Sequence, residues 1–207
     1  FEQNIEERQE VSLAEGNQGI PENTGSKEGM EKEEEEGIYV TQPGDTLSSI
    51  ASKGEVMGVP LKWPLLYRLN KRLFKGMEAD VNLPEMVLPQ GVEFNFVTKG
   101  QQARNIQSLP ENRWVVNVVS STTQGRIVPL AVKLMNVDYY VYISMAKVDG
   151  QDWMRLRVGF FQGNILTNIK GKSIKELLNI SNIWSTKVSS DEFREYAGYQ
   201  IETEGKK

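Results

Sequence analysis

The chain contains neither cysteine nor histidine. Without cysteine it forms no disulfide and no thiolate metal site. Without histidine it lacks the usual zinc ligand and the usual general base near neutral pH, which excludes a histidine-dependent serine triad. Catalysis by carboxylates alone survives as a possibility. We expect a protein that is not an enzyme, with no catalytic residues, no metal site and no cofactor.

The sequence also lacks a long apolar run. A transmembrane helix needs about 20 consecutive apolar residues, and no stretch here approaches that length. The first residue is Phe1 rather than methionine. We therefore expect membrane attachment only through an upstream signal or anchor that this sequence does not include. The 207 residues suffice for one or two modest domains.

Acidic charge is concentrated at the beginning of the chain. Residues 1–37 contain twelve glutamates and three basic residues, a net charge of −9, while the rest carries +5, which together give the stated −4. So polar a segment cannot bury enough apolar surface to fold. We predict a disordered acidic tether over residues 1–37; its run Glu33–Glu36 could also contact a basic partner protein of the cell envelope.

Residues 38–98 form the first predicted domain. A short strand at Tyr39 is followed by a Gly-Asp-Thr turn, which opens a helix with Leu47, Ile50 and Ala51 on one face. A second helix over residues 62–70 has Pro64 in its first turn. A Pro-Gln-Gly turn then leads into a closing strand, so the predicted order is βααβ.

This order, with its core Y39-V-T-Q-P-G-D-T-L47, resembles a LysM domain. The resemblance implies a module that binds glycans containing N-acetylglucosamine. It also implies that Gly44, Asp45, Thr46 and Leu47 form the sugar groove with the loop before the closing strand. The turn has a structural interpretation too, because Asp45 or Thr46 can cap the helix. Trp63 and Tyr67 share one helix face, which favours core packing over a platform for stacking sugars.

Two segments separate or interrupt the predicted elements. Residues 71–84 are basic and longer than a compact LysM loop, and we treat them as an insertion. Residues 99–112 are polar and contain a proline near their end, which predicts a linker.

Residues 113–200 form the second predicted domain, followed by a tail over residues 201–207. Strands are predicted near residues 114–120, 139–143, 153–161 and 185–188, with Asp149-Gly150 as a hairpin turn. One helix should begin near Pro129, and a capping box of Ser173 and Glu176 predicts the start of another. The order βαββαβ predicts a ferredoxin-like antiparallel sheet with two helices on one face, so the whole chain belongs to the α+β class.

The strands V115-V-N-V-V-S120 and W153-M-R-L-R-V-G-F-F161 resemble those of a SPOR domain. Asn117 occupies the position of a glutamine usual in that family, and Phe160 occupies that of a proline. The resemblance implies binding of peptidoglycan strands stripped of their stem peptides, through the open face of the sheet.

Alternation along the strands identifies the residues of that face. If Leu156 and Val158 face the helices, then Arg155 and Arg157 project from the opposite face. Three further residues should join them: Asn117, Tyr140 and Tyr142. Guanidinium, phenol and amide groups suit an anionic sugar chain, although such residues also occur on ordinary solvent-facing surfaces.

Two other functions fit parts of the pattern. Aromatic and basic residues on such a sheet also describe RNA-binding domains, but no RNA-binding strand signature is present and the isoelectric point is acidic, so we expect no nucleic-acid partner. A glycan hydrolase needs two carboxylates across a cleft, and Glu78, Asp80 and Glu85 lack a motif that arranges them. We expect a non-catalytic, periplasmic or cell-envelope protein of bacteria, of the kind that serves the cell wall and cell division, which binds peptidoglycan through two modules.

Overall fold

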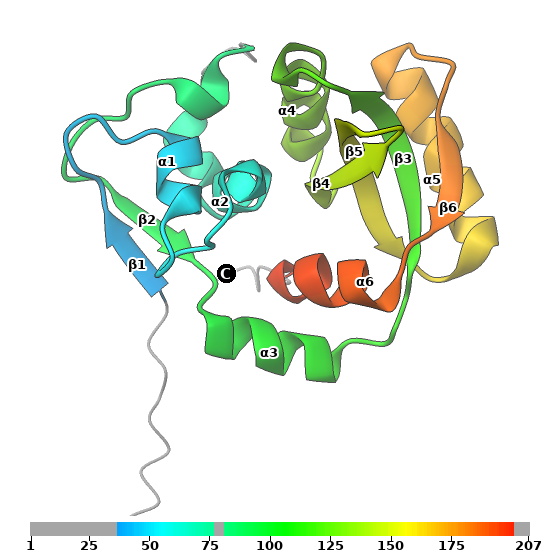
Figure 1. The fold of residues 1–207 in the computed structure, drawn as a ribbon, viewed down its shortest axis with the longest axis horizontal. Coiled ribbons are helices and arrows are strands. Elements are labelled where there is room, and N and C mark those ends of the chain that lie inside the picture. Colours follow the sequence, from blue (N-terminus) through cyan, green and yellow to red (C-terminus); the bar gives the residue numbers. More distant parts are fainter. Residues whose placement is uncertain (1–36, 77–80, 201–207) are drawn as a thin grey trace, which may run out of the picture. The chain divides into compact units, whose positions relative to one another are not determined.

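The computed structural model describes residues 37–76 and 81–200. It is a mixed α+β structure with two antiparallel sheets, and the described residues belong to one compact unit (Figure 1). The predicted acidic tether, apart from Gly37, and the predicted tail lie outside the described residues. We refer to residues 37–98 as the N-terminal module and to residues 113–200 as the C-terminal module.

The N-terminal module has the predicted βααβ order. Strand β1 (Gly37–Val40) leads to α1 (Leu47–Ser52) and α2 (Trp63–Leu69), and β2 (Glu93–Phe96) closes the module. The two strands pair antiparallel, with Tyr39 opposite Phe94. Three short 3-10 helices connect these elements: η1 (Pro60–Lys62), η2 (Lys71–Phe74) and η3 (Leu83–Glu85).

The helices of this module are held in place by their apolar faces, which are buried in one core. Leu47, Ile50 and Trp63 are fully buried, and Tyr67 is 3% exposed, which confirms core packing for the two aromatic residues of α2. The segment predicted as an insertion also contributes, since Phe74 at its start is buried in the same core. The insertion is therefore anchored by apolar packing, although Lys71, Arg72 and Lys75 beside Phe74 are basic.

The C-terminal module has the predicted βαββαβ order. Its elements are β3 (Trp114–Ser121), α4 (Val128–Asn136), β4 (Val141–Val148), β5 (Gln151–Phe161), α5 (Gly163–Leu178) and β6 (Trp184–Lys187), with the short 3-10 helix η4 (Gln124–Arg126) before α4. The strands form one antiparallel sheet in the order β4-β5-β3-β6. The Asp149-Gly150 hairpin is confirmed, with both residues at positive φ as a type I′ turn requires.

Two features of this module differ from the sequence prediction. The second helix begins at Gly163 rather than at Ser173, whose hydroxyl lies 3.4 Å from the Ile169 carbonyl oxygen one turn earlier in the same helix. A serine inside a helix can donate in this way, so the apparent capping box was misleading. In addition, α6 (Ser190–Tyr196) and the 3-10 helix η5 (Ala197–Tyr199) follow β6.

The segment predicted as a linker contains a helix, α3 (Lys99–Ser108). A capping box between Thr98 and Gln101 begins it. The helix packs against η5, and the Asn105 side-chain amide donates to the Gly198 carbonyl at 2.8 Å. A Cβ atom at Gly198 would lie 2.6 Å from the Gln102 carbonyl oxygen, so this close approach requires glycine. The connection between the modules is thus a packed element.

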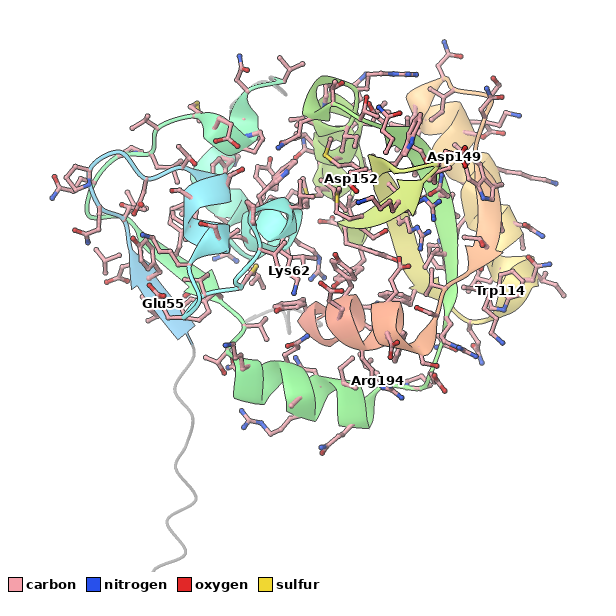
Figure 2. All side chains as sticks on the ribbon, in the orientation of Figure 1. Glu55, Lys62, Trp114, Asp149, Asp152 and Arg194 are labelled. Atoms are coloured by element: carbon pink, nitrogen blue, oxygen red, sulfur yellow. The ribbon has the colours of Figure 1, made fainter. Side chains whose placement is uncertain are left out.

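Direct contacts join the two modules. The Tyr67 hydroxyl lies 3.3 Å from Asn136 Oδ1, and the Lys71 ammonium lies 2.9 Å from Asp138 Oδ1. Lys62, drawn with the other side chains in Figure 2, is 6% exposed and lies 3.7 Å from the Glu195 carboxylate. Burial lowers the pKa of Lys62, an effect that Glu195 partly opposes. Separate folding of the modules stays a prediction.

Candidate functional site

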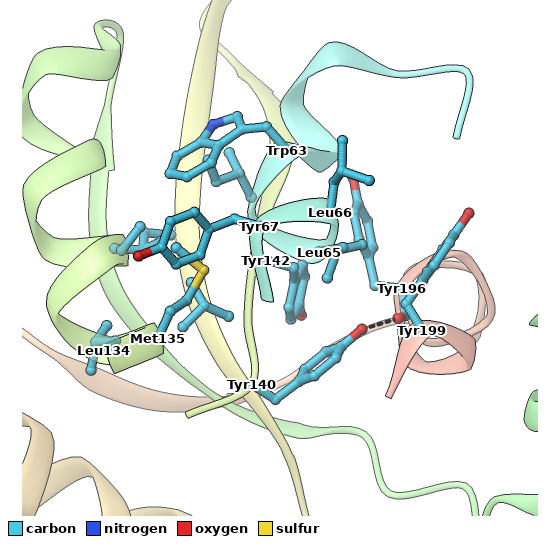
Figure 3. Packing of buried hydrophobic residues seen from close by; sticks show 14 of the residues in the cluster. Trp63, Leu65, Leu66, Tyr67, Leu134, Met135, Tyr140, Tyr142, Tyr196 and Tyr199 are labelled. Atoms are coloured by element: carbon cyan, nitrogen blue, oxygen red, sulfur yellow. Dashed lines mark hydrogen bonds between the residues drawn. The ribbon is translucent and has the colours of Figure 1, made fainter. Parts of the chain in front are cut away.

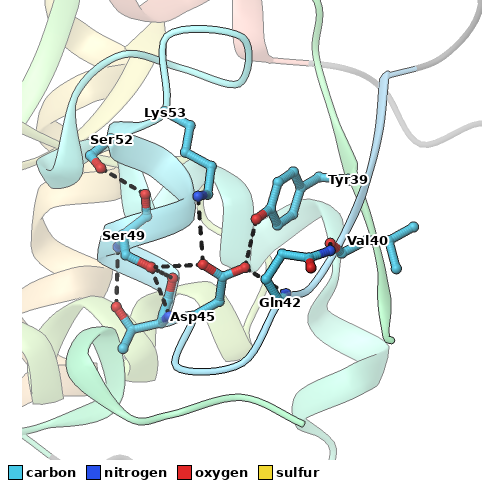
Figure 4. A network of polar contacts seen from close by, with 8 residues as sticks. Tyr39, Val40, Gln42, Asp45, Ser49, Ser52 and Lys53 are labelled. Carbon is cyan, nitrogen blue, oxygen red and sulfur yellow. Dashed lines mark hydrogen bonds and ion pairs between the residues drawn. The ribbon is translucent and has the colours of Figure 1, made fainter. Parts of the chain in front are cut away.

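The turn between β1 and α1 is built around the buried carboxylate of Asp45. It accepts hydrogen bonds from the Tyr39 hydroxyl at 2.6 Å and from the Gln42 backbone N–H at 2.8 Å, with the Lys53 ammonium 3.7 Å away (Figure 4). Burial alone would raise the pKa of Asp45, but the Tyr39 and Gln42 hydrogen bonds and Lys53 outweigh it and lower the pKa. The carboxylate is committed to holding the turn.

Of the remaining residues of the predicted sugar groove, two stabilise the helix or the core and one is exposed. Thr46 is the N-cap of α1 and forms a reciprocal capping box with Ser49. Leu47 is fully buried in the core. Its side chain and that of Asp45 are therefore withheld from a ligand in this conformation. Gly44 is exposed at a φ of +83° and leaves the backbone accessible.

The loop before β2 lies beside this turn, as the predicted groove requires. The Leu88 backbone N–H donates to the Asp45 carbonyl at 2.8 Å, and the Thr41 hydroxyl donates to the Pro89 carbonyl at 2.6 Å. Thr41 also accepts from the Val92 N–H at 2.9 Å. The two loops are thus fixed to each other by a main-chain hydrogen bond and by the Thr41 hydroxyl, with the exposed Val87 beside them.

The residues predicted for the sheet face of the C-terminal module do share that face. Asn117 pairs with Arg157, which pairs with Tyr142 on the next strand. Their predicted exposure is wrong: the exposed fraction is 1% for Asn117, 6% for Tyr140, 0% for Tyr142 and 6% for Arg157. Arg155 is half-buried. Most of the predicted binding surface is therefore covered.

Helix α6 and η5 provide the cover. The Tyr196 ring stacks on Tyr142 with 4.6 Å between centroids, and Tyr140 donates its hydroxyl to the Tyr196 carbonyl (Figure 3). The Glu192 carboxylate accepts from the Tyr142 hydroxyl at 2.9 Å and pairs with Arg157. Burial, with Glu192 adding to it, raises the pKa of Tyr142.

A sequence signal for α6 exists. Ser189 caps the helix by accepting from the Glu192 N–H, and buried aromatic residues follow at Phe193 and Tyr196. A capping residue followed by apolar residues three or four apart is typical of a short amphipathic helix. Its location on the sheet could not be read from this local pattern.

One part of the sheet face remains accessible beyond α6. Arg155 and Trp153 alternate along β5 and are half-buried, and Trp184 of β6, which pairs with Asn117, is 52% exposed. Several buried polar atoms on this face have no hydrogen-bond partner among the described residues: both side-chain amide atoms of Asn117, Ser144 Oγ and Arg157 Nε. Such atoms cost about 1–3 kcal/mol each unless buried water satisfies them, and they are too buried to contact a ligand directly.

Comparison with protein-family models, with curated proteins and with solved structures finds no match for this chain. Within residues 37–76 and 81–200, no helix is long and apolar enough to cross a membrane. No group of three potential metal-ligating side chains occurs in the same ranges. Glu85, one of the carboxylates considered for hydrolysis, is exposed, whereas Glu78 and Asp80 lie outside the described residues.

Proposed function

We propose that this protein is a non-catalytic, glycan-binding protein of the bacterial cell envelope, and that its two modules bind peptidoglycan strands. The observation that carries the proposal is the pairing of two fixed loops in a LysM-like βααβ module. The Asp45 network and the Thr41 hydrogen bonds hold those loops rigid. A rigid turn with accessible backbone groups suits sugar hydroxyls, because little ordering is needed on binding.

The C-terminal module supports the proposal as well. Its candidate glycan-binding surface is smaller than the open sheet face expected from its SPOR-like, ferredoxin-like topology. Exposed Trp184 and half-buried Trp153 offer flat apolar rings for the C–H faces of sugars. Arg155 lies next to Trp153 on the same face and can pair with a carboxylate. We place the glycan contact of this module at these three residues rather than at the covered tyrosines.

RNA binding by this module is the less favoured function. Single-stranded RNA is bound by bases stacking on exposed aromatic residues in the middle of such a sheet. Here the aromatic residues Tyr142 of β4 and Phe160 of β5 are buried beneath α6. Among the aromatic residues of this sheet within residues 113–200, Trp184 on β6 is the one that is largely exposed.

Retention on purified sacculi tests the proposal directly. The full chain should sediment with sacculi and bind soluble chitin oligomers, with amide chemical-shift changes at Gly44 and at Val87. Trp184→Ala and Arg155→Gln should each weaken retention on amidase-treated sacculi by about threefold to tenfold. Lys147→Gln is a matched control on the same sheet, because Lys147 is 70% exposed and lies on the β4–β5 hairpin.

Three results would refute parts of this function. Absence of binding to both sacculi and chitin oligomers refutes glycan recognition as a whole. Unchanged retention of both variants refutes the Trp184–Arg155 surface. Release of soluble glycan fragments during incubation would show that the protein is a hydrolase.

A further inference from the structure

The two modules enclose a groove at their junction, with a volume of about 840 Å³. One side is formed by α2, η2 and β2 of the N-terminal module, and the other by Asn136 and Asp138 of the C-terminal module. The predicted glycan surfaces lie elsewhere, at the Gly44 turn and on the sheet face. This groove is therefore a separate candidate site.

Inter-module contacts determine the shape of the groove. The Tyr67 hydroxyl reaches Asn136, and the Lys71 ammonium lies 2.9 Å from both the Asn136 carbonyl oxygen and Asp138 Oδ1. The Tyr67 ring packs against Phe74 with 4.7 Å between centroids. Both rings lie at the floor of the groove and are almost fully buried, and Asn136 and Asp138 of the C-terminal module complete its lining.

Positive charge dominates the N-terminal side of the groove. Lys71 is neutralised by Asp138, but Arg72 and Lys75 are exposed and form no ion pair with any residue in the described ranges. They lie on or directly after η2, with the 47%-exposed Leu73 between them. The lining contains two exposed acidic residues, Glu93 and Asp138, and Asp138 is paired with Lys71. Two available cations beside apolar side chains suit a ligand that combines carboxylates with small apolar groups.

We propose that this groove binds a short acidic peptide, namely the stem peptide attached to peptidoglycan, whose carboxylates pair with Arg72 and Lys75. The identity of the peptide rests on the proposed function. The Arg72 guanidinium supplies paired donors to one carboxylate, and Lys75 supplies a point charge for a second. Small alanine side chains of the stem would contact the exposed side chain of Leu73. The protein would then read the peptide and the glycan at different places.

The probe is a soluble stem tetrapeptide released from sacculi by amidase, titrated into the full chain by calorimetry. The double variant Arg72→Gln/Lys75→Gln should lose about tenfold in affinity for the tetrapeptide. Its affinity for chitin oligomers should stay unchanged. The matched control is Lys172→Gln/Lys175→Gln, which removes the same charge from exposed positions on α5, outside the groove.

The outcomes separate this inference from the proposed function. Equal losses of tetrapeptide affinity in both double variants would overturn it, because only long-range charge would then be acting. Failure of the wild-type protein to bind the tetrapeptide would also overturn it. If the groove variant lost binding of a single-stranded oligonucleotide but kept binding of the tetrapeptide, the groove would be a nucleic-acid site and the inference would be overturned. Tetrapeptide binding that depends on Arg72 and Lys75, without any binding to chitin or sacculi, would support the groove and refute glycan recognition.

Discussion

Replacing Phe193 by alanine tests whether α6 is a permanent part of the C-terminal core. Phe193 is 4% exposed, and its ring meets Phe160 edge to face at 5.1 Å between centroids. A buried phenylalanine removes about 150–200 Å² from water, which corresponds to about 4–5 kcal/mol at 25 cal/mol/Å². Measured losses for Phe→Ala in cores are about 3–5 kcal/mol. We therefore expect the free energy of unfolding to fall by about 3–5 kcal/mol.

Urea unfolding at 25 °C, followed by tryptophan fluorescence, measures this loss. Ile165→Ala on α5 is the control, because Ile165 is 80% exposed and its truncation should cost less than about 0.5 kcal/mol. If α6 were instead a detachable cover, Phe193→Ala would leave the free energy of unfolding almost unchanged. It would also increase affinity for stripped glycan by uncovering Tyr142 and Arg157. That combined result would refute the assignment of α6 to the core and restore the sheet face as the binding surface.

Three further predictions follow from other contacts. Because the pKa of Asp45 is lowered from its ordinary value of 3.8, the carboxylate stabilises the fold above that value, and this stabilisation is lost as pH falls through the lowered pKa. Asp45→Asn should therefore flatten this part of an acid-unfolding curve, and an unchanged curve would contradict the prediction. Arg157→Gln leaves the Glu192 carboxylate without its cationic partner, so the free energy of unfolding measured in urea should fall by about 3 kcal/mol while the preference among glycans stays the same. A changed glycan preference at unaltered stability would count against the Arg157–Glu192 pairing. Fragments 38–98 and 113–200 should each unfold cooperatively, but at lower midpoint urea concentrations than the full chain, because the contacts between the modules are lost. A fragment without a cooperative transition would show that the module boundary is wrong.

Local signals predicted most of the elements correctly. A cap at Asp45 or Thr46, Pro64 in the first turn of α2 and the Asp149-Gly150 hairpin were all predicted from neighbouring residues, and the structure identifies Thr46 as the cap. Alternation along β5 also identified which side chains share a face. These predictions succeeded because each depends on backbone preferences and hydrogen bonds within a few residues.

The candidate sites were less predictable. Gly44, Thr46 and the loop before β2 do come together, but Asp45 and Leu47 are buried. The sheet residues shared a face as predicted, yet that face was covered. Alternation distinguishes one side of a strand from the other and carries no information on what packs against either side.

The sequence by itself determined the α+β class, the βααβ and βαββαβ orders of the two modules, and turns such as Asp149-Gly150, but it did not reveal α3 or α6. Only the tertiary structure decided that α6 covers Tyr142 and Arg157, and that Arg72 and Lys75 border a groove completed by Asn136. Both arrangements join residues that are far apart in the chain. Their positions depend on which apolar surfaces bury each other, a property of the whole fold that no local pattern specifies.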